Sequence, residues 1–193
     1  MTAYSNKLSL NHELKGISYG GIGEVRVDGG ANYGFKNLKG NPGLIDSVPE
    51  LQRDPSLRRV IERVNEAGTD LFSIGCVSSD VHDDHGYRLS GYVEFSLNSI
   101  SGIQDASNYF RLFFHFDRLL YENHFPESAC FDWELQPAQF HEANSGGFTC
   151  TIFINTSYFD TREKTENCWA NSLNTVGQFL GSVPKQSHDP IYR

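Results

Sequence analysis

Two histidines and two aspartates follow one another in the run His82-Asp83-Asp84-His85, whose residue types could hold a divalent cation. Imidazole nitrogens and carboxylate oxygens are common ligands of such metals. The run stands between two segments of alternating hydrophobicity, however, and Gly86 follows it, which is the composition of a hairpin turn. Four turn residues rarely bring three side chains to one point. We therefore expect a polar turn there, and neither a metal nor another cofactor.

Three carboxylates on predicted strands, Glu94, Asp132 and Glu134, could divide the roles of general acid and general base. No nucleophile or zinc signature of the GxSxG or HExxH kind accompanies them. The sequence therefore identifies no catalytic residue and favours a protein that is not an enzyme. A site between sheet and helices that uses these carboxylates and His115 is kept as an alternative.

The four cysteines lie far apart and share no CxxC spacing. Three of them fall on predicted strands and one on a predicted helix. This distribution is typical of buried free thiols in a reducing compartment, and it predicts neither a disulfide nor a zinc site. The four residues are Cys76, Cys130, Cys150 and Cys168.

One pattern of secondary structure occurs twice between Thr69 and Gly181: two strands joined by a turn, and then an amphipathic helix. Two such hairpins and two helices predict an α+β fold, in which one antiparallel sheet is built from two consecutive ββα units and carries its helices on one face. The first unit covers 70–79, 87–97 and a helix at about 105–123, and the second covers 130–136, 148–155 and a helix at about 160–180.

The domain organisation follows from this pattern and from composition. Residues 1–45, which hold half of the 18 glycines, are predicted to form an N-terminal extension with a short hairpin between 14–19 and 24–28. Residues 46–183 form a single domain of the order α-ββα-ββα, whose first helix at 55–67 is capped by Asp54. Residues 184–193 are a C-terminal tail. This order of elements is similar to that of the secretion-chaperone-like folds of small, acidic, dimeric bacterial chaperones.

Acidic residues dominate the middle of a chain whose formal net charge is −8. No lysine occurs between Lys39 and Lys164. A field of this sign opposes binding to nucleic acid or to an anionic membrane and favours a basic protein partner. The N-terminus shows no signal peptide and no run of apolar residues is long enough to cross a bilayer, so we expect a cytoplasmic protein.

Two surfaces are predicted to bind protein. If helices cover one face of the sheet, the other face carries an aromatic residue and carboxylates, a combination suited to a cationic partner. The helix after Asp105 also has two apolar stripes. We expect the second stripe to be covered either by residues 1–68 or by another protein chain. A second copy of the same chain, which would make a homodimer, is one such chain. The predicted residues are Tyr92, Glu94, Asp132 and Glu134 on the sheet and Phe110, Phe114 and Tyr121 on the helix.

These patterns together favour a non-catalytic acidic module that occludes a basic surface of a partner protein. An inhibitor, an immunity protein, an anti-defence protein and a secretion chaperone all act in this way. The alternatives are an enzyme or small-ligand-binding protein and a structural subunit of a larger assembly.

Overall fold

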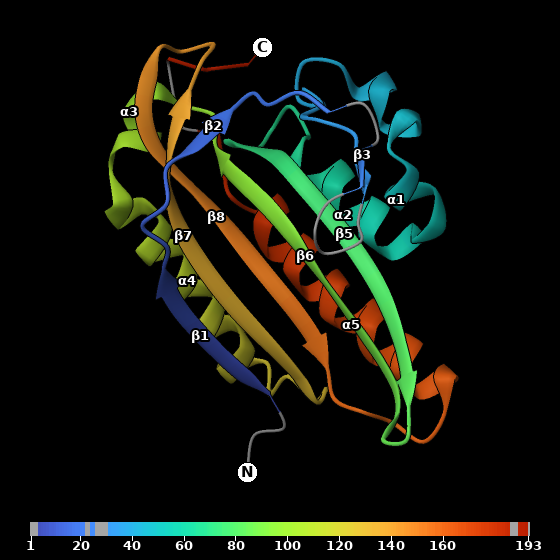
Figure 1. The fold of residues 1–193 in the computed structure, drawn as a ribbon. Helices are drawn as coiled ribbons and strands as arrows, with labels where there is room; N and C mark the ends of the chain where they lie inside the picture. The colour runs from blue at the N-terminus through green and yellow to red at the C-terminus, as the bar shows by residue number, and fades with distance from the viewer. Residues whose placement is uncertain (1–3, 22–23, 26–30, 186–188, 193) are drawn as a thin grey trace.

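A six-stranded, mostly antiparallel sheet forms the centre of the molecule (Figure 1). The computed structural model describes residues 4–21, 24–25, 31–185 and 189–192. The strands follow the order β1-β7-β8-β6-β5, and β2 also pairs with β7. They are β1 (Ser5–Leu10), β2 (Lys15–Ile17), β5 (Leu71–Asp83), β6 (Gly86–Leu97), β7 (Ala129–Phe140) and β8 (Ser145–Thr156).

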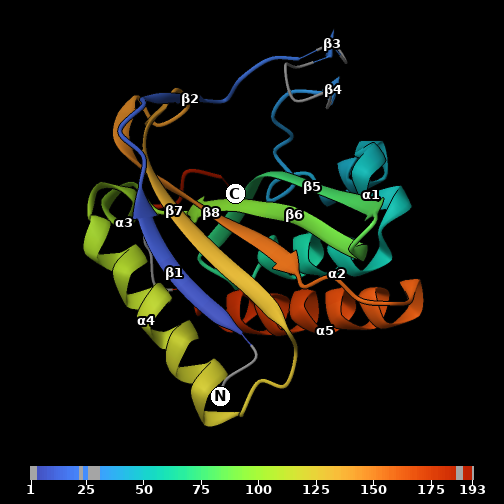
Figure 2. The same cartoon turned by 60° about the horizontal axis from the view of Figure 1, so that its bottom comes forward.

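The chain combines this sheet with helices, so the fold is mixed α/β. The helices lie mainly on one side of the sheet (Figure 2). Helix α4 (Ala106–Glu122) and helix α5 (Arg162–Gly181) cover the sheet, and α2 (Pro55–Val64) packs beside α5. The shorter elements are a 3-10 helix (Pro42–Ser47), α1 (Pro49–Arg53), α3 (Ile100–Gln104) and a separate two-stranded sheet of β3 (Glu24–Val25) and β4 (Ala31–Asn32).

Aromatic rings fill the space between the sheet and these helices. The Phe116 ring of α4 lies 5.2 Å from that of Phe131 and 5.5 Å from that of Trp133, both on β7. The Phe179 ring of α5 completes the cluster at 5.2 Å from Phe116. All four side chains are buried, so the residues that alternate with Phe131 and Trp133 must face the other side of the sheet.

Helix α2 begins as its sequence predicts. The Asp54 side chain accepts hydrogen bonds from the backbone N–H groups of Ser56 and Leu57, both at 2.9 Å, and Pro55 occupies the first helical position. The same carboxylate accepts a 2.7 Å hydrogen bond from the indole Nε1 of Trp169 on α5. Asp54 therefore both caps one helix and joins it to another.

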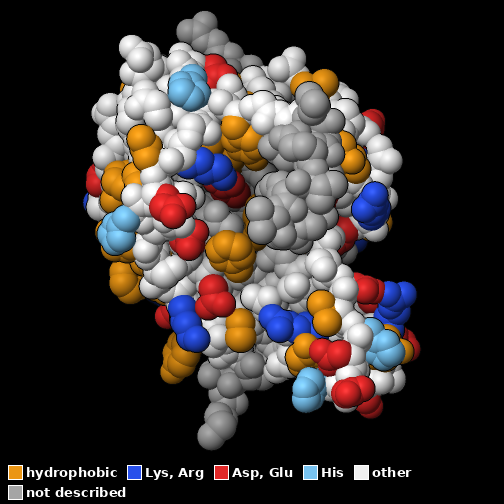
Figure 3. All heavy atoms as spheres, viewed as in Figure 1, with side chains coloured by type: hydrophobic (Ala, Val, Ile, Leu, Met, Phe, Trp, Pro, Cys, Tyr) orange, Lys and Arg blue, Asp and Glu red, His pale blue; other side chains and the backbone are white. Residues whose placement is uncertain are grey.

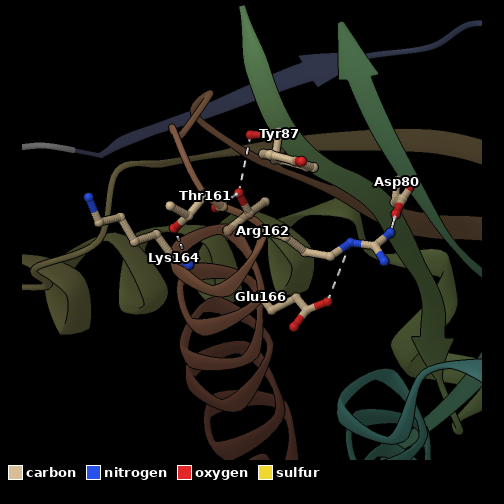
Figure 4. A network of polar contacts seen from close by, with 7 residues as sticks. Asp80, Tyr87, Thr161, Arg162, Lys164 and Glu166 are labelled. Carbon is tan, nitrogen blue, oxygen red and sulfur yellow. Dashed lines mark hydrogen bonds and ion pairs between the residues drawn. The ribbon is translucent and has the colours of Figure 1, made fainter.

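The start of α5 is fixed to the β5–β6 hairpin by polar contacts (Figure 4). Thr165 donates a 3.2 Å hydrogen bond to the backbone oxygen of Tyr87, and Arg162 pairs with Asp80 of β5. The N-cap is Thr161, whose hydroxyl accepts a hydrogen bond from the N–H of Lys164. The neighbouring Asp160 pairs with the Lys164 ammonium at 2.9 Å.

Parts of the N-terminal region belong to the main sheet. Strand β1 pairs with β7 in parallel, Ser5 opposite Cys130, and β2 continues this edge with Ile17 opposite Phe140. Residues 15–17 therefore pair with β7, and residues 24–25 pair with β4 rather than with 14–19 as the predicted hairpin required. The physical reason is that β7 would otherwise present an open edge, and Ile17 is fully buried there. The rest of the predicted segment 24–28, residues 26–28, lies outside the described part.

The described C-terminal residues pack against the rest of the chain. Asn98 and Tyr192 exchange two hydrogen bonds, from Asn98 Nδ2 to the Tyr192 oxygen at 2.7 Å and from the Tyr192 N–H to Asn98 Oδ1 at 2.8 Å. The Tyr192 ring is buried 4.9 Å from that of Phe72. Asp189 accepts hydrogen bonds from the Ser99 hydroxyl and the Ser101 N–H. The last described residues are therefore docked on the domain.

Candidate functional site

The side of the sheet opposite α4 and α5 presents ordered rows of side chains across the strands. Asp132 of β7 lies opposite Phe153 of β8, which lies opposite Tyr92 of β6. In the adjacent row, Glu134 lies opposite Thr151 and Thr151 opposite Glu94. The structure therefore brings the four sheet residues chosen from the sequence onto one face. We call this the open sheet face, defined by Tyr92, Glu94, Asp132, Glu134, Thr151 and Phe153.

Glu94 is the most deeply buried charged residue of this face, with only 3% of its surface exposed. Its Oε2 atom lies 2.5 Å from the ammonium nitrogen of Lys15, which belongs to β2. The same ammonium lies 5.4 Å from the centre of the Tyr19 ring, within the range of a cation–π contact. The Oε1 atom of Glu94 is buried and has no hydrogen-bond partner in the described part of the chain.

A hollow in the open sheet face brings basic, acidic and hydrophobic side chains together (Figure 3). Gly75 contributes to the free space there. A Cβ atom at this position would lie 3.5 Å from Glu94 Oε2, 3.5 Å from the Tyr19 hydroxyl and 3.6 Å from the Tyr92 ring. A cavity of about 100 Å³ adjoins it and is lined by these two tyrosines, Tyr33 and Glu50 among others.

Aromatic and polar contacts shape the rest of the face. The rings of Tyr92 and Phe153 meet edge to face with centroids 5.8 Å apart, and 37% of Phe153 is exposed. Glu134 is half-buried and accepts a 3.3 Å hydrogen bond from Asn11. Such an aromatic pair flanked by carboxylates can contact apolar and cationic groups of another molecule together.

The charge of the open sheet face is more balanced than the acidic sequence suggested. Lys7 of β1 lies opposite Asp132, Lys15 pairs with Glu94, and Arg88 lies on the same side, where it donates a 2.8 Å hydrogen bond to Asn155. Both lysines belong to residues 1–45, which the sequence predicted as an extension and not as strands of the sheet. No local signal in the sequence pairs Lys15 with a residue 79 positions away.

The predicted residues on α4 lie in a different layer from the open sheet face, because α4 covers the opposite side of the sheet. Phe110 is half-buried, whereas Phe114 is 64% exposed and Tyr121 is 70% exposed. The described part of residues 1–68 therefore leaves much of this second apolar stripe uncovered. The two predicted surfaces do not form one site.

The hairpin tip between β5 and β6 is held by local contacts. The His82 ring stacks on Tyr87 with centroids 4.1 Å apart. Asp83 accepts hydrogen bonds from the His85 N–H at 2.8 Å and the Tyr158 hydroxyl at 2.9 Å, and these bonds lower the pKa of its carboxyl. No group of three or more histidine, cysteine or acidic residues within the described ranges is arranged to hold a metal.

The cysteines have different environments although all four are free. Burial raises the pKa of Cys76 to about 12 and that of Cys168 to about 11, and it also raises that of Cys150. Cys130 is exposed and Cys76 is only half-buried, which corrects the expectation of four buried thiols. The reason for the exposure of Cys130 is its register on β7: it lies opposite Asn155, two residues before Asp132, and so belongs to the open side of the sheet.

A larger groove of about 560 Å³ lies elsewhere, where α3, α4 and the end of α5 meet. Asp105, Arg111 and His115 line it together with apolar residues that include Leu112 and Phe179. His115 is the only residue of the alternative acid–base set among its lining residues. The groove therefore does not bring His115 together with Glu94, Asp132 and Glu134, as the enzyme alternative predicted.

Comparisons with models of protein families, with curated proteins and with solved structures returned no match to this chain. Among the helices in the described ranges, none is long and apolar enough to cross a membrane.

Proposed function

We propose that this protein is a non-catalytic binding module that docks a basic segment of a partner protein on the open sheet face. The observation that carries the proposal is the row Asp132–Phe153–Tyr92, which places a carboxylate beside a partly exposed pair of rings on the side of the sheet opposite α4 and α5. Aromatic residues of this kind supply much of the binding energy of protein interfaces. Carboxylates at the same surface select a cationic partner.

The mode of action that fits this surface is occlusion. A partner segment laid across the strands would have its lysine and arginine side chains neutralised by Asp132 and Glu134 and its apolar groups covered by Tyr92 and Phe153. An inhibitor, an immunity or anti-defence protein and a secretion chaperone all use such masking. Avoidance of nucleic acid and membranes, and a cytoplasmic location, stay predictions from the sequence.

The test is quantitative affinity capture from the native host followed by mass spectrometry. We expect a basic protein to be retained by the wild type and lost with the charge variant Asp132→Asn/Glu134→Gln and with the ring variant Tyr92→Ser/Phe153→Ser. The matched control is Asp84→Asn/Glu163→Gln, which removes the same two charges from exposed positions away from this face. Retention should also weaken as salt rises, because salt screens charge attraction.

Equal retention of the partner by the wild type, both face variants and the control would reject the proposal. Loss with the control variant as well would mean that overall acidity, and not this face, holds the partner.

A second candidate function is small-ligand binding in the groove at α3, α4 and α5. Its volume of about 560 Å³ falls within the usual range of ligand pockets, and Arg111, His115 and Asp105 supply polar groups.

A third option, a structural subunit, has the exposed α4 stripe in its favour, and the same stripe is where a second copy of this chain would dock. The construction of the sheet from two consecutive ββα units stays a prediction, and none of these proposals depends on it.

A further inference from the structure

We propose that Glu94 and Tyr19 form a cradle for a primary ammonium group, which Lys15 occupies in the free protein and a lysine side chain of the partner occupies in the complex. This inference rests on the proposed function and names the group that the open sheet face recognises. The cradle is defined by Glu94, Tyr19 and the space above Gly75.

The contacts of Lys15 show what the cradle accepts. Its ammonium nitrogen lies 2.5 Å from Glu94 Oε2 and 5.4 Å from the Tyr19 ring centre. One contact is a charge-assisted hydrogen bond and the other is a cation–π contact. Together they recognise a positive charge that carries N–H donors at the end of a slim alkyl chain.

The accessibility of the pair shows how exchange could occur. The Lys15 side chain is 29% exposed, while that of Glu94 is only 4% exposed, so the lysine lies on the solvent side of the carboxylate. Lys15 also starts β2, which has only three residues, and the three residues before it are exposed. Moving this one side chain outward would open the cradle without breaking the central strands.

The charge of Glu94 explains why only a cation can replace Lys15. A buried carboxylate that loses its partner is strongly destabilised. Exchange of one ammonium for another leaves Glu94 paired both before and after the partner binds, and it returns the Lys15 ammonium to water. The Oε1 atom, which has no partner in the described chain, leaves an acceptor for a further N–H of the incoming group.

The experiment uses the full chain with Lys15→Ala and n-butylammonium as the probe, with thermal unfolding as the readout. The substitution should lower the melting temperature, and n-butylammonium should raise it again along a saturating curve. n-Butanol, which lacks the charge, and tetramethylammonium, which lacks N–H donors, should restore much less. The double variant Lys15→Ala/Glu94→Gln should not respond to n-butylammonium.

Three results would overturn the inference: equal rescue by n-butanol, equal rescue by tetramethylammonium, or an unchanged response in the double variant. If Lys15→Ala does not fold, the wild type is titrated with n-butylammonium while the Lys15 side-chain signal is followed by NMR. A shift of that signal toward the solvent-exposed lysine value, absent with n-butanol, supports exchange, and no shift at saturating probe contradicts it.

The captured partner separates this inference from the proposed function. If the partner's lysine enters the cradle, Lys15→Ala should bind the partner more tightly than the wild type, because the internal competitor is gone. If the partner is bound with unchanged or lower affinity, the open sheet face remains the docking surface and the cradle proposal fails. If no partner depends on the open sheet face, the proposed function fails while the result with n-butylammonium still decides the cradle.

Discussion

Replacement of Asp54 by alanine should destabilise the protein more than an ordinary helix-cap substitution does. The Asp54 carboxylate accepts two backbone hydrogen bonds at the start of α2, and loss of such a cap costs about 1 kcal/mol. It also accepts the 2.7 Å hydrogen bond from Trp169, whose indole is buried, and an unsatisfied buried donor costs about 1–3 kcal/mol. The expected loss of unfolding free energy is therefore about 2–4 kcal/mol.

A double-mutant cycle with Trp169→Phe separates the two contributions. The phenylalanine variant keeps a large ring but has no N–H to leave unsatisfied, so Asp54→Ala should cost only the cap, about 1 kcal/mol, in its presence. Urea unfolding followed by circular dichroism measures all four proteins. Strictly additive losses, or a loss below about 0.5 kcal/mol for Asp54→Ala alone, would refute the dual role of this carboxylate.

Three further predictions concern single groups. Cys130 should be alkylated well before Cys168 in the folded protein, because Cys130 is exposed whereas burial raises the pKa of Cys168 to about 11. Mass spectrometry follows both reactions, and equal rates would contradict the register of β7. Burial and the Lys185 charge lower the pKa of Lys39 to about 8. An NMR titration of Lys185→Gln should therefore show the pKa of Lys39 rising toward 10.5, and an unchanged pKa would exclude the Lys185 charge as a cause. The pKa of Asp189 lies below its usual value of 3.8 because hydrogen bonds favour the carboxylate. The contribution of Asp189 to the free energy of unfolding is full near neutral pH and is lost as the pH falls through that lowered pKa. Urea unfolding should therefore give free energies of unfolding for Asp189→Asn and the wild type that converge in acid. A difference between the two proteins that stays constant with pH would argue against a role of the charge.

Local patterns in the sequence predicted a large part of the domain because they depend on near neighbours. The alternation of Phe131 and Trp133 with Asp132 and Glu134 is the one that the sheet shows, and the cap at Asp54 follows from its side chain and Pro55. These features arise from period-two burial and from short-range hydrogen bonds, which a sequence displays directly.

Long-range pairing could not be predicted in the same way. Strand β1 joins β7 across more than a hundred residues, and the segment between Leu10 and Lys15 gives no turn signal that would announce a parallel partner. The contact of Lys15 with Glu94 depends on the pairing of β2 with β7, so the sequence predicted an acidic face without the lysine that neutralises Glu94. The burial of Tyr192, which depends on its contact with Asn98, was missed for the same reason. The exposure of Cys130, in contrast, follows from the period-two alternation of β7, which the sequence does display.

Oxidative footprinting of aromatic side chains in the captured complex tests most directly where the partner binds. Phe153 on the open sheet face and Phe114 and Tyr121 on α4 are all exposed in the free protein, so each should react there. A partner docked on the open sheet face should protect Phe153 while Phe114 and Tyr121 keep their reactivity. Protection of the two α4 residues with Phe153 unchanged would contradict the account and would place the interface on the helix.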